Sequence, residues 1–457
     1  MAVDNLPNNT QSPFTKTKSL DEIIVVVDLG ASKTKVIFQE YPNGQPQVVC
    51  MDSEVADVSL ESLQAILVGG QPESNCWVSL PGEGSYAVGY LARYKFGGNA
   101  MLRSLKFDWA IPKVAGVLWV VSQKLGKKGS FRVRLSVLLP PSEGGDTKLL
   151  GEKLLQQLQE FVTPTGIMRV KLVDFMALRE GFGIARYRQT VLGDKFNYCN
   201  IAVVMVGYRN TSILPIVRGT PGLGASSDLG MFFMVNNFVS DCGAGLSSDD
   251  PKVLEALVEA GSECDATVLL SLSRKRKSED IAADGERFAA VARRSRADYA
   301  KAVIRWLSQT IPDDTDEIIL CGGTARYIKD ELTQYCDETG IDVIWDGGIV
   351  VPKVLDTYGM SERLADVLGL YQYYVSKLDS LKKKDGATRL VEMIEAAEKA
   401  EKEAVEKAAR EAAERKKAAE VAYLVAQIEE HKKNRRETWW LEEQLYRLTD
   451  GKQGRRL

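Results

Sequence analysis

Three short glycine turns hold the residues of this chain that are best suited to chemistry. Each turn follows a run of apolar residues, and the turns are centred on Gly30, on Gly207 and on the pair Gly322-Gly323. Glycine lets the backbone approach a ligand closely, and successive amides in a turn form a concavity that binds anions. The turns therefore indicate either a phosphate site or ordinary connections between strands.

The first turn combines an acid with small polar and basic side chains. Asp28 ends the apolar run that begins at Ile23, and Ser32 and Lys35 follow shortly after it. Magnesium prefers a few carboxylate contacts, with phosphate oxygens and water completing its shell. This turn therefore suits a magnesium–phosphate complex with Asp28 on the metal side. Neither the Walker pattern nor G-x-G-x-x-G occurs, which disfavours the P-loop and Rossmann classes.

Histidine and cysteine usage excludes several other kinds of site. The one histidine, His431, lies in a charged segment near the C-terminus. Histidine general bases, Ser-His-Asp triads and His-ligated metals are therefore nearly excluded for residues 1–430. The seven cysteines are scattered and form no C-x-x-C pair. This argues against a disulfide framework or zinc site and favours a cytoplasmic location.

The bulk properties are those of a globular chain with more than one domain. With 457 residues, two or three domains are expected. The net charge of -3 implies no general attraction to nucleic acid or membrane. No apolar run is long enough for a membrane span, and the polar first 20 residues do not resemble a signal peptide.

The elements that position the turns recur along the chain. A strand, a glycine turn and a return strand at 23–41 are followed by the same pattern at 200–217. Helices are expected at about 225–240 and 284–309, and a closing helix at 361–378. The pattern predicts an α/β protein with a disordered arm at 1–21 and a charged tail at 381–457.

The order and separation of these motifs resemble those of the actin-like ATPase superfamily. The similarity is greatest to bacterial plasmid-segregation actins of the ParM/StbA type, and it covers about 22–378. It rests on the segments DLGASKTKV, ALREGFGIAR, VVMVGYRNTS, GTPGLGASSDLG, IILCGGTARYIKDEL and SERLADVLGLYQYY. The resemblance implies a two-lobed actin-like (ribonuclease H-like) fold with a nucleotide cleft, to which a long C-terminal helix is added. Lobe I would span 22–195, and lobe II, including the closing helix, would span 196–380.

The resemblance also assigns roles to individual residues. Asp28 falls at the metal-side acid and Lys35 at the phosphate-contacting lysine, whereas Glu180 falls where this type places the acid that faces the attacking water. Asp28 and Glu180 are therefore the candidate catalytic residues, with Mg²⁺ at Asp28. The candidate residues for binding ATP or GTP are Gly30, Ser32, Lys35, Gly207, Arg209, Asn210, Thr211, Gly322, Gly323 and Thr324.

One departure from the pattern bears on activity. The second phosphate loop of this family begins with an acid that helps to hold the metal, and Met205 stands at that position here. Losing this carboxylate should weaken magnesium binding or hydrolysis. Arg209, inside the same loop, offers a compensating contact with phosphate oxygens because its fork suits that geometry.

The function implied by the resemblance is a slow ATPase that forms filaments with copies of itself when nucleotide is bound. Its role would be plasmid or DNA segregation through a DNA-bound adaptor, or a bacterial cytoskeleton. Two alternatives stay open: a scaffold that binds nucleotide with little hydrolysis, and a small-molecule kinase of the same superfamily. A kinase needs an acid for the acceptor's proton, and the second loop offers none.

The tail differs in composition from the rest of the chain. Residues 386–430 are rich in Ala, Glu, Lys and Arg, which predicts one long helix, either a coiled coil or a solvated single helix. Basic residues then precede Trp439 and Trp440. Such a cluster suits an oligomerisation contact, an acidic partner, DNA or a membrane surface, so direct nucleic-acid binding stays open.

Overall fold

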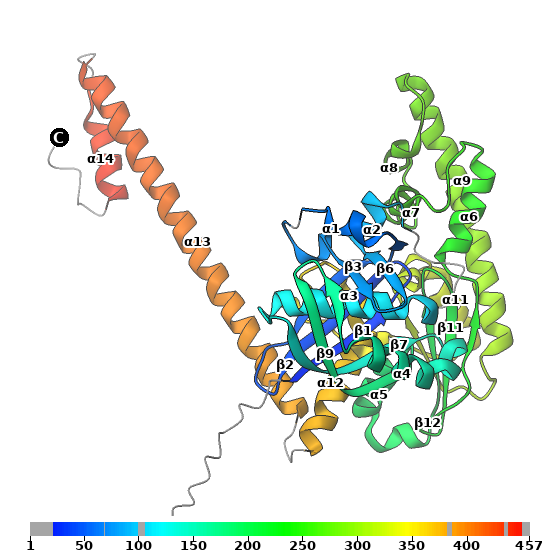
Figure 1. The fold of residues 1–457 in the computed structure, drawn as a ribbon. Helices are drawn as coiled ribbons and strands as arrows, with labels where there is room; N and C mark the ends of the chain where they lie inside the picture. The colour runs from blue at the N-terminus through cyan, green and yellow to red at the C-terminus, as the bar shows by residue number, and fades with distance from the viewer. Residues whose placement is uncertain (1–21, 68, 99–105, 382–385, 434–436, 450–457) are drawn as a thin grey trace, which may run out of the picture. The chain divides into compact units, whose positions relative to one another are not determined.

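A computed structural model describes residues 22–67, 69–98, 106–381, 386–433 and 437–449 of the chain (Figure 1). The arm expected at 1–21 lies outside the described residues. The chain divides into two compact units between Ala387 and Thr388. The N-terminal unit is an α/β structure with two mixed sheets, as the alternation of predicted strands and helices indicates.

The larger sheet has nine strands in the order β3-β2-β1-β7-β9-β8-β5-β6-β4. Strand β1 pairs antiparallel with β2 and parallel with β7, and the sheet continues antiparallel from β2 to β3 and parallel from β7 to β9. The bounds are β1 (Glu22–Leu29), β2 (Lys33–Tyr41), β3 (Gln47–Asp52), β4 (Val55–Asp57), β5 (Trp77–Leu80), β6 (Gly84–Val88), β7 (Ser130–Leu139), β8 (Phe161–Thr163) and β9 (Gly166–Arg179).

The smaller sheet repeats this plan. Its order is β12-β11-β10-β14-β15, with β13 paired to β11. Strand β10 pairs antiparallel with β11 and parallel with β14. Further out, β11 pairs antiparallel with β12 and β14 pairs parallel with β15, as their counterparts do in the larger sheet. The bounds are β10 (Asn200–Val206), β11 (Thr211–Val217), β12 (Thr220–Pro221), β13 (Ala225–Ser227), β14 (Glu317–Cys321) and β15 (Asp342–Trp345). The recurrence seen in the sequence thus extends to five strands, since β12-β11-β10-β14-β15 match β3-β2-β1-β7-β9 in order and direction.

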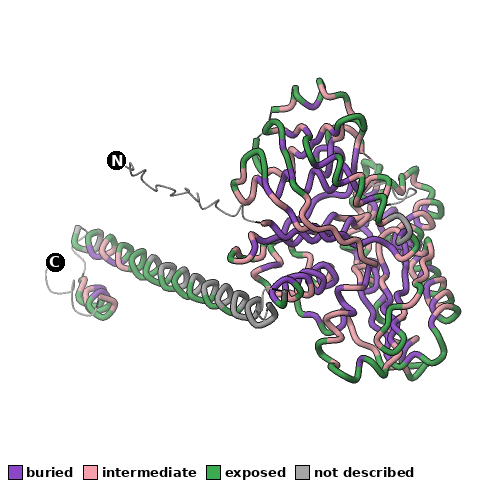
Figure 2. Tube along the Cα trace, turned by 60° about the horizontal axis from the view of Figure 1, so that its bottom comes forward, coloured by how far each residue is buried: buried purple, intermediate pink, exposed green. Residues whose placement is uncertain are grey.

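Helices cover the sheets and close the cores. In the larger sheet, β1 is apolar and fully buried at each position from Ile23 to Val27 (Figure 2 shows the buried residues in purple). Because successive side chains point to opposite faces, such a strand must be covered on both. Val25 and Val27 share a core with α3, and α12 also contacts β1. The carboxyl end of β1, which carries Asp28, is therefore held firmly in place.

A second core forms between the smaller sheet and the helices α6 and α9, which lie side by side. The helices of the N-terminal unit are α1 (Leu60–Gln64), α2 (Tyr90–Lys95), α3 (Ala110–Lys124), α4 (Thr147–Gln157), α5 (Phe182–Leu192), α6 (Met231–Cys242), α7 (Pro251–Glu259), α8 (Ala266–Leu269), α9 (Ser278–Thr310), α10 (Gly323–Tyr327), α11 (Lys329–Thr339) and α12 (Ala365–Leu381). None of the helices in the described part of the chain combines the length and apolar character that crossing a bilayer requires.

Helices α5 and α12 cross with their backbones in contact. A Cβ atom added to Gly183 of α5 would lie 2.0 Å from the carbonyl oxygen of Asp366 in α12. One added to Gly369 of α12 would lie 2.4 Å from the carbonyl oxygen of Gly183. Real Cβ contacts are not this short, so both positions require glycine. The crossing brings the start of α12 beside the start of α5.

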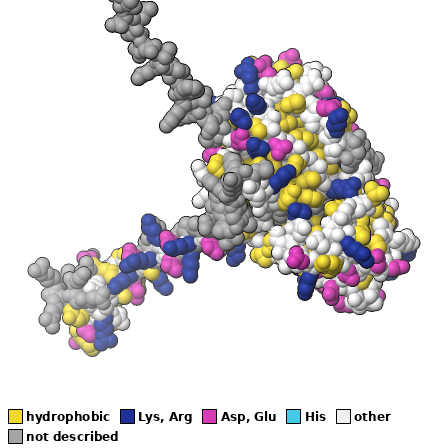
Figure 3. Space-filling view, turned by 90° about the horizontal axis from the view of Figure 1, so that it is seen from below, with side chains coloured by type: hydrophobic (Ala, Val, Ile, Leu, Met, Phe, Trp, Pro, Cys, Tyr) yellow, Lys and Arg dark blue, Asp and Glu magenta, His cyan; other side chains and the backbone are white. Residues whose placement is uncertain are grey.

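The C-terminal unit contains α13 (Gly386–Lys433) and α14 (Trp439–Leu448). Positive and negative side chains alternate along the coloured part of α13 in Figure 3, and Arg410 and Glu414 lie 4.0 Å apart, one helical turn from each other. A small apolar cluster joins the two helices through Leu424, Ile428, Leu441 and Leu445. This cluster is the core of the C-terminal unit.

Replacing Ile428 by aspartate is expected to detach α14 from α13. The Ile428 side chain is fully buried, and a carboxylate there would be desolvated without a partner. Hydrogen exchange should rise at least about tenfold in peptides covering α14, because loss of even 1.4 kcal/mol of local stability changes the open fraction tenfold. Peptides from residues 22–381 are the internal control. Faster exchange there as well would contradict the independence of this cluster.

Candidate functional site

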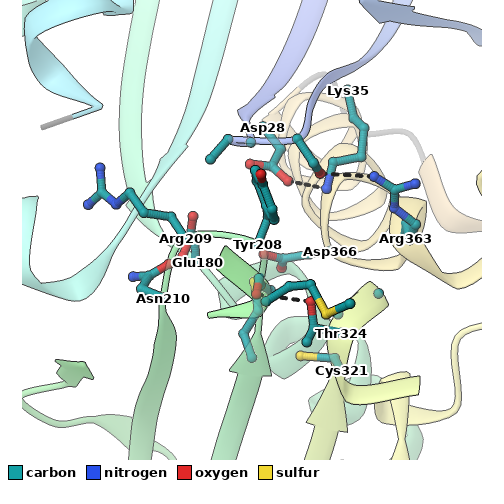
Figure 4. Close-up of a pocket in the computed structure, with 18 of the residues that line it drawn as sticks. Asp28, Lys35, Glu180, Tyr208, Arg209, Asn210, Cys321, Thr324, Arg363 and Asp366 are labelled. Carbon is teal, nitrogen blue, oxygen red and sulfur yellow. Dashed lines mark hydrogen bonds and ion pairs between the residues drawn. The ribbon is translucent and has the colours of Figure 1, made fainter. Parts of the chain in front are cut away.

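A pocket in the N-terminal unit lies where the three glycine turns meet (Figure 4). The first turn follows β1, the second follows β10, and the third follows β14. Among the residues that line the pocket are almost all of the candidates found in the sequence, namely Asp28, Gly30, Ser32, Lys35, Glu180, Gly207, Arg209, Asn210, Gly322, Gly323 and Thr324.

Thr211 is the candidate that does not line this pocket. It is the first residue of β11 and is fully buried. Its hydroxyl donates a hydrogen bond of 2.6 Å to the carbonyl oxygen of Leu229, so its side chain supports the loop before α6. The Thr211 hydroxyl is therefore used within the fold, and its assignment to nucleotide binding stays a prediction. The strand register explains the difference, since Thr211 already pairs with Val206 in the sheet.

The first turn places an acid and a lysine opposite each other. Asp28 and Lys35 are register partners across β1 and β2, and Lys35 Nζ lies 2.5 Å from Asp28 Oδ2. The chain between them turns at Gly30, where a Cβ atom would lie 2.4 Å from the carbonyl oxygen of Lys33. Glycine is thus required by the closeness of the turn, which leaves the turn backbone facing the pocket.

The second turn occupies the equivalent place in the smaller sheet. Leu29 and Thr34 form the last pair of the first hairpin, and Val206 and Thr211 form the last pair of the second. One step back along the strands, the pair Asp28–Lys35 is matched by Met205–Ser212. Met205 therefore stands at the counterpart of Asp28, as the motif comparison predicted.

Lys106 is a pocket residue that the sequence did not reveal. Its Nζ atom forms an ion pair with Glu180 and lies 3.4 Å from Asp28 Oδ1. Its side chain is only 8% exposed. A single lysine in an irregular segment carries no motif, so no signal in the sequence could have singled it out. The structure places it between the two candidate catalytic acids.

The charges around Asp28 determine its protonation. Burial alone would raise the pKa of the Asp28 carboxyl, but the ammonium groups of Lys35 and Lys106 outweigh this and hold its pKa at about 2. Burial likewise opposes the charge of Lys106, yet Glu180 and Asp28 raise the pKa of its ammonium group above the ordinary value. Both groups are therefore charged at neutral pH.

Arg209 of the second turn is oriented by a buried acid. Its Nη2 atom lies 2.7 Å from Oε1 of Glu143, which is 1% exposed. The other carboxylate oxygen of Glu143 accepts a hydrogen bond of 3.0 Å from the backbone amide of Phe107. Glu143 thus links the second turn to the residue next to Lys106. It does not line the pocket, and its role depends on contacts that are distant in sequence.

The third turn is tied to the other two. The Thr324 hydroxyl donates a hydrogen bond of 3.0 Å to the carbonyl oxygen of Gly207 in the second turn. Arg363, beside Gly323, donates one of 3.0 Å to the Ser32 hydroxyl in the first turn. Gly322 has a φ of +98°, and a Cβ there would lie 2.4 Å from the carbonyl oxygen of Val206. Direct contacts therefore fix the spacing of the three turns.

Asp366 is a second pocket residue that the sequence analysis missed. Its carboxylate accepts hydrogen bonds from the backbone amides of Gly181 at 2.7 Å and Ile184 at 3.2 Å, which satisfies the start of α5. Burial raises its pKa to about 7, and the charges of Asp28 and Glu180 act in the same direction. Asp366 lies in the first turn of α12, where acids are favourable, but the closing helix was predicted to begin at residue 361 and so did not single it out.

Replacing Asp366 by asparagine is expected to remove a pH dependence of stability. The folded-state pKa lies above the unfolded value, so this carboxyl contributes stability below pH 4 that is lost as pH rises through about 7. The full change corresponds to about 4 kcal/mol. Asparagine does not titrate. Its side chain has one oxygen, so it can replace only one of the two acceptors that the carboxylate offers to the backbone amides, at every pH.

Urea denaturation between pH 4.5 and 8 measures this difference. The free energy of unfolding of the parent should fall with pH relative to that of Asp366→Asn. A matched control is Asp241→Asn, which makes the same chemical change at a carboxyl that is 47% exposed and lies outside the pocket. Parallel curves for the parent and Asp366→Asn would contradict the buried, proton-binding role.

The described residues do not fit a preformed magnesium site. Asp28 is the one carboxylate in the first two turns, and its oxygens face Lys35 and Lys106. Glu180 is paired with Lys106 as well. The described part of the chain contains no cluster of three or more His, Cys, Asp or Glu residues that could hold a metal ion. Mg²⁺ at Asp28 is therefore a prediction that this arrangement does not support.

Comparison with known proteins gives matches among solved structures. No protein-family model matches the chain, and neither does a curated protein. A ParM filament from Clostridium botulinum is 14% identical, with a TM-score of 0.49, over 78% of this chain and 99% of the other. An archaeal actin homologue in complex with ADP is 16% identical, with a TM-score of 0.49, over 76% of this chain and 97% of the other.

AlfA from a Bacillus subtilis plasmid, also solved as a filament, is 13% identical, with a TM-score of 0.44, over 76% of this chain and 98% of the other. The structural neighbours are actin-like proteins. They agree with the resemblance predicted from the motifs. At this level of identity and with TM-scores below 0.5, they carry no statement about what this chain binds or does.

Proposed function

We propose that this chain is an actin-like protein that binds ATP or GTP in the pocket and assembles with copies of itself when nucleotide is bound. The observation that supports this most is the convergence of the glycine turns. Equivalent hairpins of the two sheets, which share the order of five strands, line the same pocket together with the turn after β14. A ligand can approach the backbone of such turns closely, and with cations nearby the turns suit the phosphates of a nucleotide.

The two sheets define the two lobes of this proposal. We propose bounds of 22–195 for the first lobe and 196–380 for the second, although α12, which falls in the second range, packs on β1 and β2 of the larger sheet. The pocket lies at the hairpins of both sheets. The third turn is linked to the second through Thr324, and Arg363 beside it is linked to the first. By the family resemblance, this turn would contact the nucleoside part of the ligand. The tail that contains α13 forms a further part.

Within the pocket, the charged side chains divide into two roles. Lys35 and Arg209 come from the two hairpins, and their positive charges would meet the phosphate oxygens. Glu180 would orient a water molecule toward the terminal phosphorus, and the bond from that phosphorus to the bridging oxygen would then break. Because Met205 replaces a second acid, we expect this hydrolysis to be slow.

Self-association follows from the family resemblance. The ParM structure from Clostridium botulinum and the AlfA structure are filaments. For this chain we propose filaments that serve plasmid or DNA segregation through a DNA-bound adaptor, or a bacterial cytoskeleton. The support for this step is the order of the sequence motifs, which extends from the first turn to the closing helix.

Sedimentation of the full chain with ATP, GTP, ADP or no nucleotide tests the proposal, together with phosphate release. Pelleting that requires ATP or GTP, accompanied by slow phosphate release, is the expected result. Nucleotide binding without pelleting or phosphate release would support a scaffold instead. Transfer of phosphate to a small acceptor without pelleting would support a kinase. Absence of nucleotide binding would overturn the proposal.

A further inference from the structure

We propose that the ammonium group of Lys106 takes the place of a divalent cation in the pocket, so that this chain binds nucleotide without magnesium. The inference rests on the proposed nucleotide function. It concerns how the chain balances the charges of its own acids and of the phosphates, and it departs from the magnesium complex that the first turn predicts from sequence.

The position of Lys106 is the first support. A divalent cation serving Asp28 and Glu180 would have to lie between their carboxylates, and Lys106 Nζ already pairs with both. The two acids come from different parts of the larger sheet, since Asp28 lies in β1 and Glu180 directly follows β9. One cation thus joins two elements, which is the structural task of a metal ion in such a site.

The second support is that Lys106 is held in the pocket. It is nearly buried, and the amide of the next residue, Phe107, donates to the carboxylate of Glu143. Glu143 also pairs with Arg209 of the second turn. A lysine on an exposed loop could pair with any of several acids. Lys106 is instead held beside the turn that would face the phosphates of the ligand. Its neighbours also keep it charged.

The third support is the loss of the second acid. The counterpart of Asp28 in the second hairpin is Met205, so the pocket offers a metal fewer carboxylates than the pattern of the sequence family would. A dication entering between Asp28 and Glu180 would also meet the positive charges of Lys35 and Lys106 at short range. Like charges on nearly buried side chains repel strongly, so entry would require Lys106 to leave.

The test measures ADP affinity of the full chain by isothermal titration calorimetry, once with excess Mg²⁺ and once with EDTA. The parent should bind ADP with dissociation constants that agree within about threefold in the two buffers. Lys106→Met keeps the length of the side chain but removes the charge. It should lose about 10- to 100-fold in affinity in EDTA, because a charge-assisted contact is lost. Mg²⁺ should restore much of this loss.

Lys33→Met is the matched control. Lys33 lies in the same hairpin as Lys35, but its ion pair is with Asp52 and it does not line the pocket. The control should behave like the parent in both buffers. Thermal melting verifies that each variant is folded, and Lys106→Arg, which keeps the charge, should bind ADP in EDTA even if Lys106→Met fails to fold.

The outcomes separate this inference from the function on which it rests. ADP binding by the parent that weakens more than tenfold in EDTA would overturn the role of Lys106 and leave the nucleotide site standing. Equal, buffer-independent affinities of the parent and folded Lys106→Met would also overturn it. If the parent binds neither ADP nor ATP in either buffer, the proposed function itself fails.

Discussion

Methionine in place of Lys35 is expected to weaken ADP binding about 100-fold in either magnesium or EDTA, since a charged contact with phosphate contributes up to about 3 kcal/mol. Lys35 lies opposite Asp28 at the start of the hairpin and is the lysine that this turn presents to the pocket. Because Asp28 keeps Lys106 as a partner, the acid is not left without a counter-charge. The fold should therefore tolerate the change.

Calorimetric titration with ADP measures the loss, and circular dichroism verifies the fold. Lys33→Met again serves as the control, since it removes a lysine from the same strand but outside the pocket. The difference in ADP affinity between Lys35→Met and Lys33→Met should be nearly as large as the whole loss caused by Lys35→Met. If both lose the same amount of affinity, the loss reflects the general charge of the hairpin and not a contact made by Lys35.

Alanine in place of Gly183 is expected to lower the free energy of unfolding by about 3 kcal/mol or more. In most helices this substitution is stabilising by up to about 1 kcal/mol, because glycine is a poor helix former. Here the added methyl group would lie 2.0 Å from the carbonyl oxygen of Asp366, so α5 and α12 would have to move apart. The sign of the change therefore decides whether the backbones truly touch.

Urea denaturation of Gly183→Ala and Gly69→Ala gives the comparison. Gly69 has no atom within 4 Å of the position that a Cβ would occupy, so its change should have little effect. Since Asp366 also holds the start of α5, forcing the helices apart should weaken ADP binding as well. A Gly183→Ala protein as stable as the parent would contradict the close crossing of α5 and α12.

The sequence predicted the turns well because their chemistry is local. Glycine, aspartate and lysine at short spacing after an apolar run are visible without a structure, and the structure brings Gly30, Gly207 and Gly322 to one pocket. Lys106 and Glu143 could not be found in this way, since each acts on a partner that is distant in the chain. Their roles follow from how the segments fold back on one another, which spacing along the chain does not encode.

The boundaries of the helices also depend partly on local signals and partly on pairing with distant strands. The helix expected at 225–240 is α6, which begins at Met231, because residues 225–227 pair with β11 as strand β13. The helix expected at 284–309 begins earlier, at Ser278. Glu279 and Asp280 in its first turn were an available signal, since acids there interact favourably with the helix dipole. Strand pairing, in contrast, depends on partners that the local pattern does not show.

The repeated strand order of the two sheets has a consequence for how such a pocket can evolve. If the halves descend from one ancestral segment, the shared hairpin backbone is the inherited part, and each copy is free to acquire its own side chains. The pair Asp28–Lys35 in one half and Met205–Ser212 in the other would then be divergent descendants of a single position. Selection would act on the total charge that both copies and Lys106 present to the ligand. An acid lost from one half would weaken a metal site, and the ammonium group of Lys106 would then supply the positive charge that a metal no longer brings.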